Sequence, residues 1–135
     1  MVSSLAVIST LVASAAALGI NCRGSGACVL VGASLDNVLV QVQQIQAMGQ
    51  GNRWYPAGVQ LACSEGDKGT ICAFFQSTSG GTANQAAQLI QGLKDHGCGV
   101  CGSNPTNPGN DVSHGQLTVN VVSSPCCKGN CHCPF

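Results

Sequence analysis

The stretch TANQAAQLIQGLKDHGCGVC, residues 82–101, decides the fold, because it joins a capped amphipathic helix to a pair of cysteines. Thr82 and Gln85 have the three-residue spacing of a capping box, which predicts that the helix begins at Thr82. A glycine after the last turn provides a usual helix end, and Cys98 and Cys101 follow at once. The apolar residues of this helix recur at helical spacing and need a layer to cover them: Ala86, Leu89, Ile90 and Leu93.

A second amphipathic helix is predicted earlier in the chain, from a cap at Ser34 to about Met48. Its apolar face is Leu35, Val38, Leu39, Val42 and Ile45. The runs at 59–63 and 70–76 predict a hairpin with one buried face, and 116–122 is the clearest strand. Two helices that each need a cover, together with antiparallel strands, predict an α+β domain.

Residues 1–17 have the features of a signal peptide. The apolar run at 5–13 is too short to cross a bilayer, which needs roughly 20 residues. Ala15 and Ala17 fit the small-residue rule of a signal peptidase site, so we expect cleavage before Leu18. The sequence therefore predicts a secreted, extracellular protein of residues 18–135, without stable membrane insertion, whose last part is a cysteine-rich tail at about 125–135.

All ten cysteines follow the predicted signal peptide, and an even number in a secreted chain indicates disulfides. The alternative is a metal protein, since Cys98 and Cys101 have the spacing of a zinc knuckle. The signal peptide argues against reduced thiols, so we expect neither a metal nor another cofactor. Adjacent Cys126 and Cys127 should take different partners. The cysteines are Cys22, Cys28, Cys63, Cys72, Cys98, Cys101, Cys126, Cys127, Cys131 and Cys133.

The charge balance argues against whole classes of partner. Five Lys and Arg residues balance five Asp and Glu residues, so no basic face for nucleic acid or anionic lipid is expected. Aromatic residues are too few to build a base-stacking platform. We expect a monomer that binds no nucleic acid.

Catalytic motifs are sparse in this sequence. His114, with Glu65 or Asp111, offers the residue types of a small hydrolase, but no feature of the sequence places them together. No nucleophile elbow is present. We therefore predict that the protein is not an enzyme and keep the hydrolase as an alternative.

A few polar and aromatic side chains are candidates for contact with a target. A Trp-Tyr pair in a loop either packs beneath the loop or faces a partner. An exposed lysine on a rigid, bridged scaffold can plug a cation pore, because such pores are lined by acidic rings. The candidates are Arg53, Trp54, Tyr55, Lys68 and Lys94, with Lys128 in the tail.

Several runs of the sequence closely resemble the KP-four family of killer toxins from a virus of the smut fungus. They occur in the same order as in the family and cover nearly all of residues 18–135. The runs are LGINCRGS at 18–25, HGCGVCGS at 96–103, GNDVS at 109–113 and GQLTVN at 115–120.

The resemblance implies a fold and a set of disulfides. The fold is an α/β sandwich in which two antiparallel helices pack on one face of an antiparallel sheet. The bridges are Cys22–Cys98 and Cys28–Cys101, while Cys63 should reach Cys126 or Cys127. A tail folded over the hairpin would then be bridged to both Cys63 and Cys72. Two further family bridges are missing, because their cysteines match Ala47, Tyr55, the 79–81 stretch and Ala86 or Ala87.

The resemblance also implies a function. Such a toxin inhibits the growth of competing fungi or plant host cells by perturbing calcium channels, and its partner is a voltage-gated calcium channel or another surface protein. A lysine tied to that activity in the family matches Leu61, and this chain is neutral where the toxin is basic. The alternative is a secreted effector or surface-binding module of a fungal pathogen that lacks channel activity and binds through the Trp54-Tyr55 loop.

Overall fold

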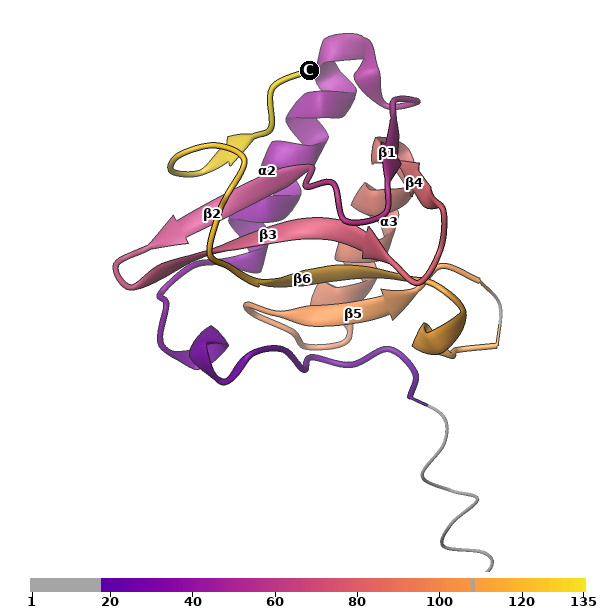
Figure 1. Cartoon of the computed structure of the whole chain (residues 1–135), viewed down its shortest axis with the longest axis horizontal. Coiled ribbons are helices and arrows are strands. Elements are labelled where there is room, and N and C mark those ends of the chain that lie inside the picture. The colour runs from indigo at the N-terminus through magenta and orange to yellow at the C-terminus, as the bar shows by residue number, and fades with distance from the viewer. Residues whose placement is uncertain (1–17, 108) are drawn as a thin grey trace, which may run out of the picture.

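The computed structural model describes residues 18–107 and 109–135 (Figure 1), so the predicted signal peptide lies outside the described residues. A five-stranded antiparallel sheet has the order β5-β6-β3-β2-β7, and β1 and β4 form a separate antiparallel pair. The strands are β1 (Trp54–Pro56), β2 (Ala62–Gly66), β3 (Gly69–Gln76), β4 (Gly80–Thr82), β5 (Gly102–Pro105), β6 (Gln116–Val122) and β7 (Cys131–His132). The helices are α2 (Leu35–Ile45) and α3 (Ala83–Asp95), with the short helical turns η1 (Gly26–Val29), η2 (Gln46–Gln50) and η3 (Val112–His114).

The two long helices run in opposite directions on one face of the sheet (Figure 1). The apolar faces of both helices and the facing side of β3 form one core, in which Leu35, Ile45, Phe75, Ile90 and Leu93 are fully buried. The predicted α+β sandwich, rich in disulfides, is therefore confirmed.

Helix α3 begins as its sequence predicts. The Oγ1 atom of Thr82 accepts a hydrogen bond from the Gln85 amide at 3.1 Å, and the Gln85 side chain accepts one from the Thr82 amide at 2.8 Å. This capping box satisfies two amide groups that would otherwise lack partners. The helix ends at Asp95, and Gly97 follows with φ of 96°, a left-handed conformation that suits glycine.

Helix α2 is shorter than predicted. It ends at Ile45, and the chain continues through η2, where Gly49 has φ of 79° and breaks the helical backbone. Ser34 occupies the cap position, but its side chain makes no cap hydrogen bond. Its amide instead donates to the Oγ atom of buried Ser64 at 3.1 Å, which ties the start of α2 to β2.

The predicted hairpin exists, but β2 begins at Ala62 rather than at residue 59. The prediction of a single buried face is wrong, because Cys63 and Cys72 on the face away from the helices are also fully buried. The reason is the tail, whose strand β7 pairs with β2 at Ala62 and Cys63. Strand β6 matches its prediction at both ends. The short strands β1, β4, β5 and β7 lie in stretches without an alternating pattern, and the sequence did not predict them.

Two disulfides join the N-terminal segment to the end of α3. Cys22 is bonded to Cys98 and Cys28 to Cys101, which are the pairings that the resemblance implies. They span 76 and 73 residues of sequence. Loops of that length correspond to a stabilisation of about 4 kcal/mol per bridge in the chain-entropy account. No helix in the described part of the chain has the length and apolar character needed to cross a membrane.

Candidate functional site

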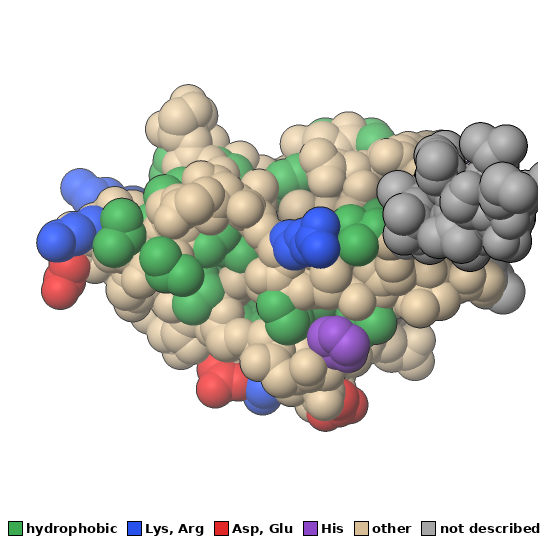
Figure 2. Space-filling model, turned by 90° about the horizontal axis from the view of Figure 1, so that it is seen from below, with side chains coloured by type: hydrophobic (Ala, Val, Ile, Leu, Met, Phe, Trp, Pro, Cys, Tyr) green, Lys and Arg blue, Asp and Glu red, His purple; other side chains and the backbone are tan. Residues whose placement is uncertain are grey.

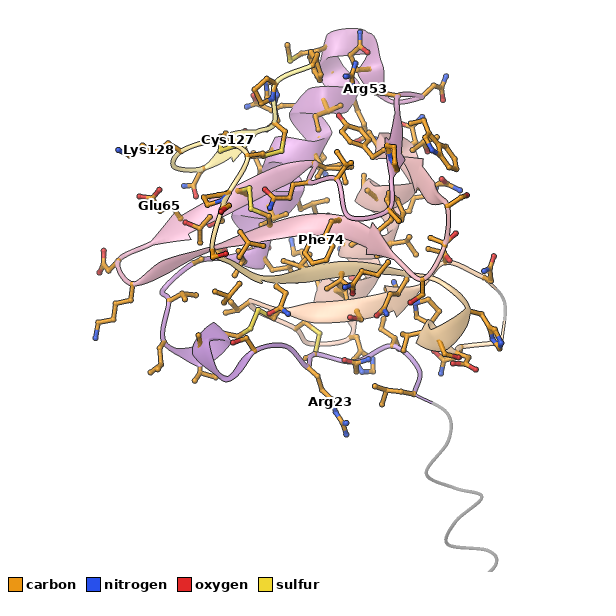
Figure 3. The ribbon with its side chains drawn as sticks, viewed as in Figure 1. Arg23, Arg53, Glu65, Phe74, Cys127 and Lys128 are labelled. Atoms are coloured by element: carbon orange, nitrogen blue, oxygen red, sulfur yellow. A yellow bond between two sulfur atoms is a disulfide. The ribbon has the colours of Figure 1, made fainter. Side chains whose placement is uncertain are left out.

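The cysteine-rich tail packs against the body through hydrogen bonds. The amide of Cys126 donates to Gln60 Oε1 at 2.7 Å, and Gln60 Nε2 donates to the carbonyl of Ser124 at 3.2 Å. The Cys133 amide donates to the carbonyl of Leu61 at 2.8 Å. At the far end of the tail loop, the Gly129 amide donates to a carboxylate oxygen of Glu65 at 3.1 Å. Figure 3 shows Glu65 close to this loop, which carries Cys127 and Lys128.

The disulfides of the tail correct one expectation. Cys63 is bonded to Cys72 and not to a tail cysteine, and the tail closes on itself through Cys126–Cys133 and Cys127–Cys131. The physical reason is strand register, because Cys63 lies directly opposite Cys72 in the β2–β3 ladder with Cα atoms 4.1 Å apart. The expected separation of partners for Cys126 and Cys127 does hold.

The sulfur atoms of Cys63, Cys126, Cys127 and Cys133 lie within 4.8 Å of one another. Four sulfurs at such distances have the arrangement of a structural zinc site, but a zinc site requires thiolates. Each of these four is in a disulfide here, so the cluster has no thiolate to offer a metal.

Between the tail and the segment around β1 lies an open cavity of about 420 Å³. Residues 53–56 and 58–60 line one side of it, and Ser124, Cys126, Cys133 and Pro134 line the other. None of the lining residues is acidic. The sequence named Arg53, Trp54 and Tyr55 as candidates, but it did not predict the cavity. No local pattern announces that a tail some 70 residues away will pack beside them.

Tyr55 is a buried residue of the cavity lining. Its side chain is only 4% exposed, and its hydroxyl has no hydrogen-bond partner among the described residues. Burial raises the pKa of Tyr55, and nearby Arg53 lowers it by a smaller amount, through its positive charge and as a hydrogen-bond donor to the phenolate.

Arg53 covers the aromatic rings at this end of the molecule. Its guanidinium carbon lies 5.8 Å from the centre of the Tyr55 ring and 5.2 Å from that of Phe135, within the range of cation–π attraction. Phe135 in turn stacks on His132 with ring centres 5.1 Å apart. Figure 3 shows Arg53 beside the end of the tail. The arginine therefore brings a positive charge to the edge of the cavity.

Trp54 and Tyr55 have different environments. Side chains alternate between the two sides of a strand, and in β1 Tyr55 is buried whereas Trp54 is 52% exposed. The two alternatives offered for the Trp-Tyr pair, packing beneath the loop or facing outward, thus apply to one residue each. Tyr55 packs beneath the surface, and Trp54 faces solvent.

The other candidate cations lie away from the cavity. Lys94 forms an ion pair with Asp36, which connects α3 to α2. Lys68 is exposed in the turn between β2 and β3. Leu61, which the resemblance matches to a lysine of the family, is fully buried and presents nothing to a partner.

Of the two pairs in the hydrolase alternative, the structure brings together His114 and Asp111 but not His114 and Glu65. His114 Nδ1 lies 3.3 Å from a carboxylate oxygen of Asp111, but Asp111 caps the η3 turn that contains His114, and Glu65 is bound to the tail. Hydrogen bonds from the Ser113 side chain and amide lower the pKa of Asp111, with a smaller contribution from His114. This aspartate caps a turn, because its side chain accepts from the Ser113 amide at 2.9 Å.

The face of the molecule seen in Figure 2 has no large patch of one charge sign. Figure 2 shows one face of the molecule, where charged side chains lie scattered among polar and apolar ones and do not gather by sign. Two apolar residues of the N-terminal segment, Val29 and Leu30, are 86% and 66% exposed, but no other feature of that surface indicates a partner. The cavity beside Arg53 is thus the site with the most defined chemistry.

Two comparisons with known proteins show the family of this chain. Residues 5–123 match the family model described as Kp4. The chain is 44% identical over 108 residues to the KP4 killer toxin of Ustilago maydis P4 virus, a match that covers 79% of this chain and 82% of the toxin. The tail after residue 123 lies beyond the family match. The chain is thus a killer-toxin-like protein and belongs to the Kp4 family.

Proposed function

We propose that the protein is secreted and inhibits the growth of competing fungi or of plant host cells, without enzymatic activity, by perturbing calcium transport through a channel at the target surface. The observation that carries this proposal is the 44% identity to a killer toxin over most of both chains.

Secretion is supported by the state of the cysteines. All ten are in disulfides, and such bridges form and persist in oxidising compartments. Residues 1–17 supply the predicted targeting signal. A rigid scaffold stapled in this way suits a protein that must survive outside the cell that makes it.

The absence of enzymatic activity is supported by the arrangement of the histidine candidate. His114 is exposed, its partner Asp111 caps the turn that holds it, and neither lines the cavity beside Arg53. A general base needs a neighbouring substrate site within hydrogen-bond reach. The inhibitory activity is therefore proposed to be one of binding.

The channel part of the proposal rests on exposed cations. Calcium pores are lined by acidic groups, which attract a positive side chain held on a rigid surface. Leu61 is buried and cannot serve, and Lys94 is held by Asp36. Arg53, like Arg23, Lys68 and Lys128, is exposed and forms no ion pair among the described residues, but of these four only Arg53 lines the cavity, so we propose it as the cation that approaches the target.

A second candidate function is favoured by one observation. Trp54 is half-exposed beside the cavity, as expected of a surface-binding module that recognises a wall or host protein. In that case the protein is a secreted effector without channel activity.

Growth assays separate the two functions. Refolded protein of residues 18–135 is applied at micromolar concentration to a panel of fungi and plant seedlings, with reduced and alkylated protein as the control. We expect growth inhibition by the folded form alone. Capture of a cell-wall or host protein that is lost in Trp54→Ala, with no growth inhibition, would instead support the surface-binding module. Neither inhibition nor capture would reject both.

A further inference from the structure

We propose that the cavity between residues 53–60 and the tail binds an acidic peptide segment, taking one carboxylate together with an apolar side chain next to it. This inference deepens the proposed function, because it names the chemistry of the target that the protein contacts. It is tested by binding alone, so its failure and that of the proposed function are distinguishable.

The first part of the argument is the buried hydroxyl of Tyr55. Unpaired polar atoms are uncommon in protein interiors, because a donor removed from water needs a replacement acceptor. This hydroxyl is unpaired among the described residues, its side chain is more than nine-tenths buried, and it lines the cavity. The hydroxyl is closed to water in the unbound structure, so an acceptor on a ligand would complete it once the Arg53 side chain that covers the ring moves aside.

The second part is charge. The Arg53 guanidinium stands at the same site, and no acidic residue lines the cavity. A guanidinium and a hydroxyl together present donors to an anion, and a carboxylate matches the planar fork of arginine. A single cation balances one carboxylate, whereas a phosphate with about two negative charges would call for more.

The third part is the apolar remainder of the wall. Pro56, Val59, Pro134 and the Cys126–Cys133 disulfide supply it, and Val59 is 46% exposed to the space in front. The side-chain amide of Gln60 is already hydrogen-bonded, because its oxygen accepts from the Cys126 amide and its nitrogen donates to the Ser124 carbonyl. The wall therefore has a place for an apolar side chain.

The same features disfavour a sugar. A saccharide needs several polar partners and an open aromatic face for stacking. The Tyr55 ring is covered by Arg53, and the side-chain amide of Gln60 is already hydrogen-bonded through both its oxygen and its nitrogen, so few polar partners remain for a sugar beside half-exposed Trp54. The cavity of about 420 Å³ is within the size range of sites for small ligands, which extends from roughly 300 to 1,000 Å³.

The site depends on a part of the chain that the family match does not include. Cys126, Cys133 and Pro134 form one wall, and all three follow residue 123, where the match ends. The tail is positioned by the hydrogen bonds of Gln60 and by pairing of β7 with β2. The proposed specificity therefore depends in part on the tail, which lies beyond the residues of the family match.

The test is a nuclear magnetic resonance titration of refolded, isotope-labelled residues 18–135. The probes are the acetylated and amidated tripeptide Leu-Glu-Leu, the matched tripeptide Leu-Gln-Leu, and digalacturonate as an acidic sugar. We expect Leu-Glu-Leu to shift the backbone signals of Arg53, Tyr55, Val59 and Cys133. The uncharged tripeptide should bind at least about tenfold more weakly, because the charge-assisted hydrogen bonds are lost.

Three variants locate the binding. Tyr55→Phe removes only the hydroxyl and should weaken binding of Leu-Glu-Leu about fivefold. Arg53→Gln should weaken it about tenfold or more. Lys68→Gln makes the same change of charge in the remote β2–β3 turn and should leave the affinity unchanged.

The proposal is overturned by any of four results: no shift at millimolar Leu-Glu-Leu, equal binding of the two tripeptides, binding of digalacturonate alone, or an affinity unchanged in both Tyr55→Phe and Arg53→Gln. If Arg53→Gln does not refold, Tyr55→Phe decides, since it keeps the shape of the core. A protein that binds the acidic tripeptide but inhibits no growth keeps this site and loses the proposed function.

Discussion

The Sγ atom of Cys63 lies 3.6 Å from that of Cys126, although Cys63 is bonded to Cys72 and Cys126 to Cys133. The tail is thus packed against the hairpin at the point where the resemblance places a covalent link, but hydrogen bonds and β pairing hold it instead. Within the described chain, no disulfide connects the tail to the body. Because no covalent bond ties the tail to the body, the tail wall of the cavity depends on these hydrogen bonds and on the pairing of β7 with β2.

The disulfides should differ in their effect on global stability. Replacing Cys22 and Cys98 together by serine should lower the free energy of unfolding by about 4 kcal/mol, because their bridge closes a long loop. Replacing Cys126 and Cys133 together should have a smaller effect and loosen the tail locally, since only 7 residues separate them. Chemical denaturation of the two double variants measures the difference. Equal losses would show that the tail is part of the main cooperative unit.

Tyr55→Phe should leave the free energy of unfolding unchanged or raise it by up to about 1 kcal/mol. The substitution removes a buried hydroxyl that has no partner among the described residues, and such an unpaired group costs stability. Ser64→Ala provides the contrast, because the buried Ser64 hydroxyl accepts from the Ser34 amide, and its loss should cost about 1–3 kcal/mol. A clear loss in Tyr55→Phe would mean that the hydroxyl is satisfied within the protein.

The alkaline titration of Tyr55 should report its burial. The chain contains one tyrosine, so tyrosinate absorbance follows this residue alone. Burial raises its pKa in the folded protein, and the midpoint should lie above the ordinary value of about 10. Arg53→Gln should move the midpoint higher still, because the arginine charge lowers the pKa.

The same titration fixes the sign of a pH effect on stability. The raised pKa means that the folded state retains its proton where the unfolded state has lost it, so stability falls as pH rises beyond about 10. Lys68→Gln serves as a control that removes a positive charge far from the ring. A folded-state midpoint at or below that of the reduced, denatured chain would be inconsistent with the described environment.

Leu61→Lys should not restore a basic contact and should instead destabilise the protein by about 3 kcal/mol or more. Leu61 is fully buried, and an unpaired ammonium in that position loses its hydration. Leu61→Met keeps the volume and should cost less than about 1.5 kcal/mol. Thermal unfolding of both variants measures the contrast, and a stable Leu61→Lys protein would argue that this segment is open to solvent.

Much of the framework follows from local sequence. The capping box of Thr82 and Gln85, the apolar faces of both helices and strand β6 are all encoded within a few neighbouring residues. The end of α2 was predicted about three residues too late, because the chain changes from α-helix to the η2 turn after Ile45, where no helix-breaking residue marks the change. The bridges of Cys22 and Cys28 followed from the resemblance, since spacing alone does not determine connectivity.

The site was less accessible to sequence reasoning. Arg53 and Tyr55 were named as candidates, but the cavity depends on contacts between residues about 70 positions apart, such as Gln60 with Cys126. The bond between Cys63 and Cys72 depends on strand register, which a one-residue slip would change. These are tertiary features, and no periodicity in the chain records them.

Calcium uptake in a sensitive fungal hypha or root cell tests the central claim most directly. The refolded protein of residues 18–135 is compared with its reduced and alkylated form and with Arg53→Gln, all at micromolar concentration. The account predicts that the folded protein reduces calcium uptake, that Arg53→Gln does so less strongly, and that the reduced form has no effect. Growth inhibition with calcium uptake unchanged, or equal activity of the reduced form, would contradict it.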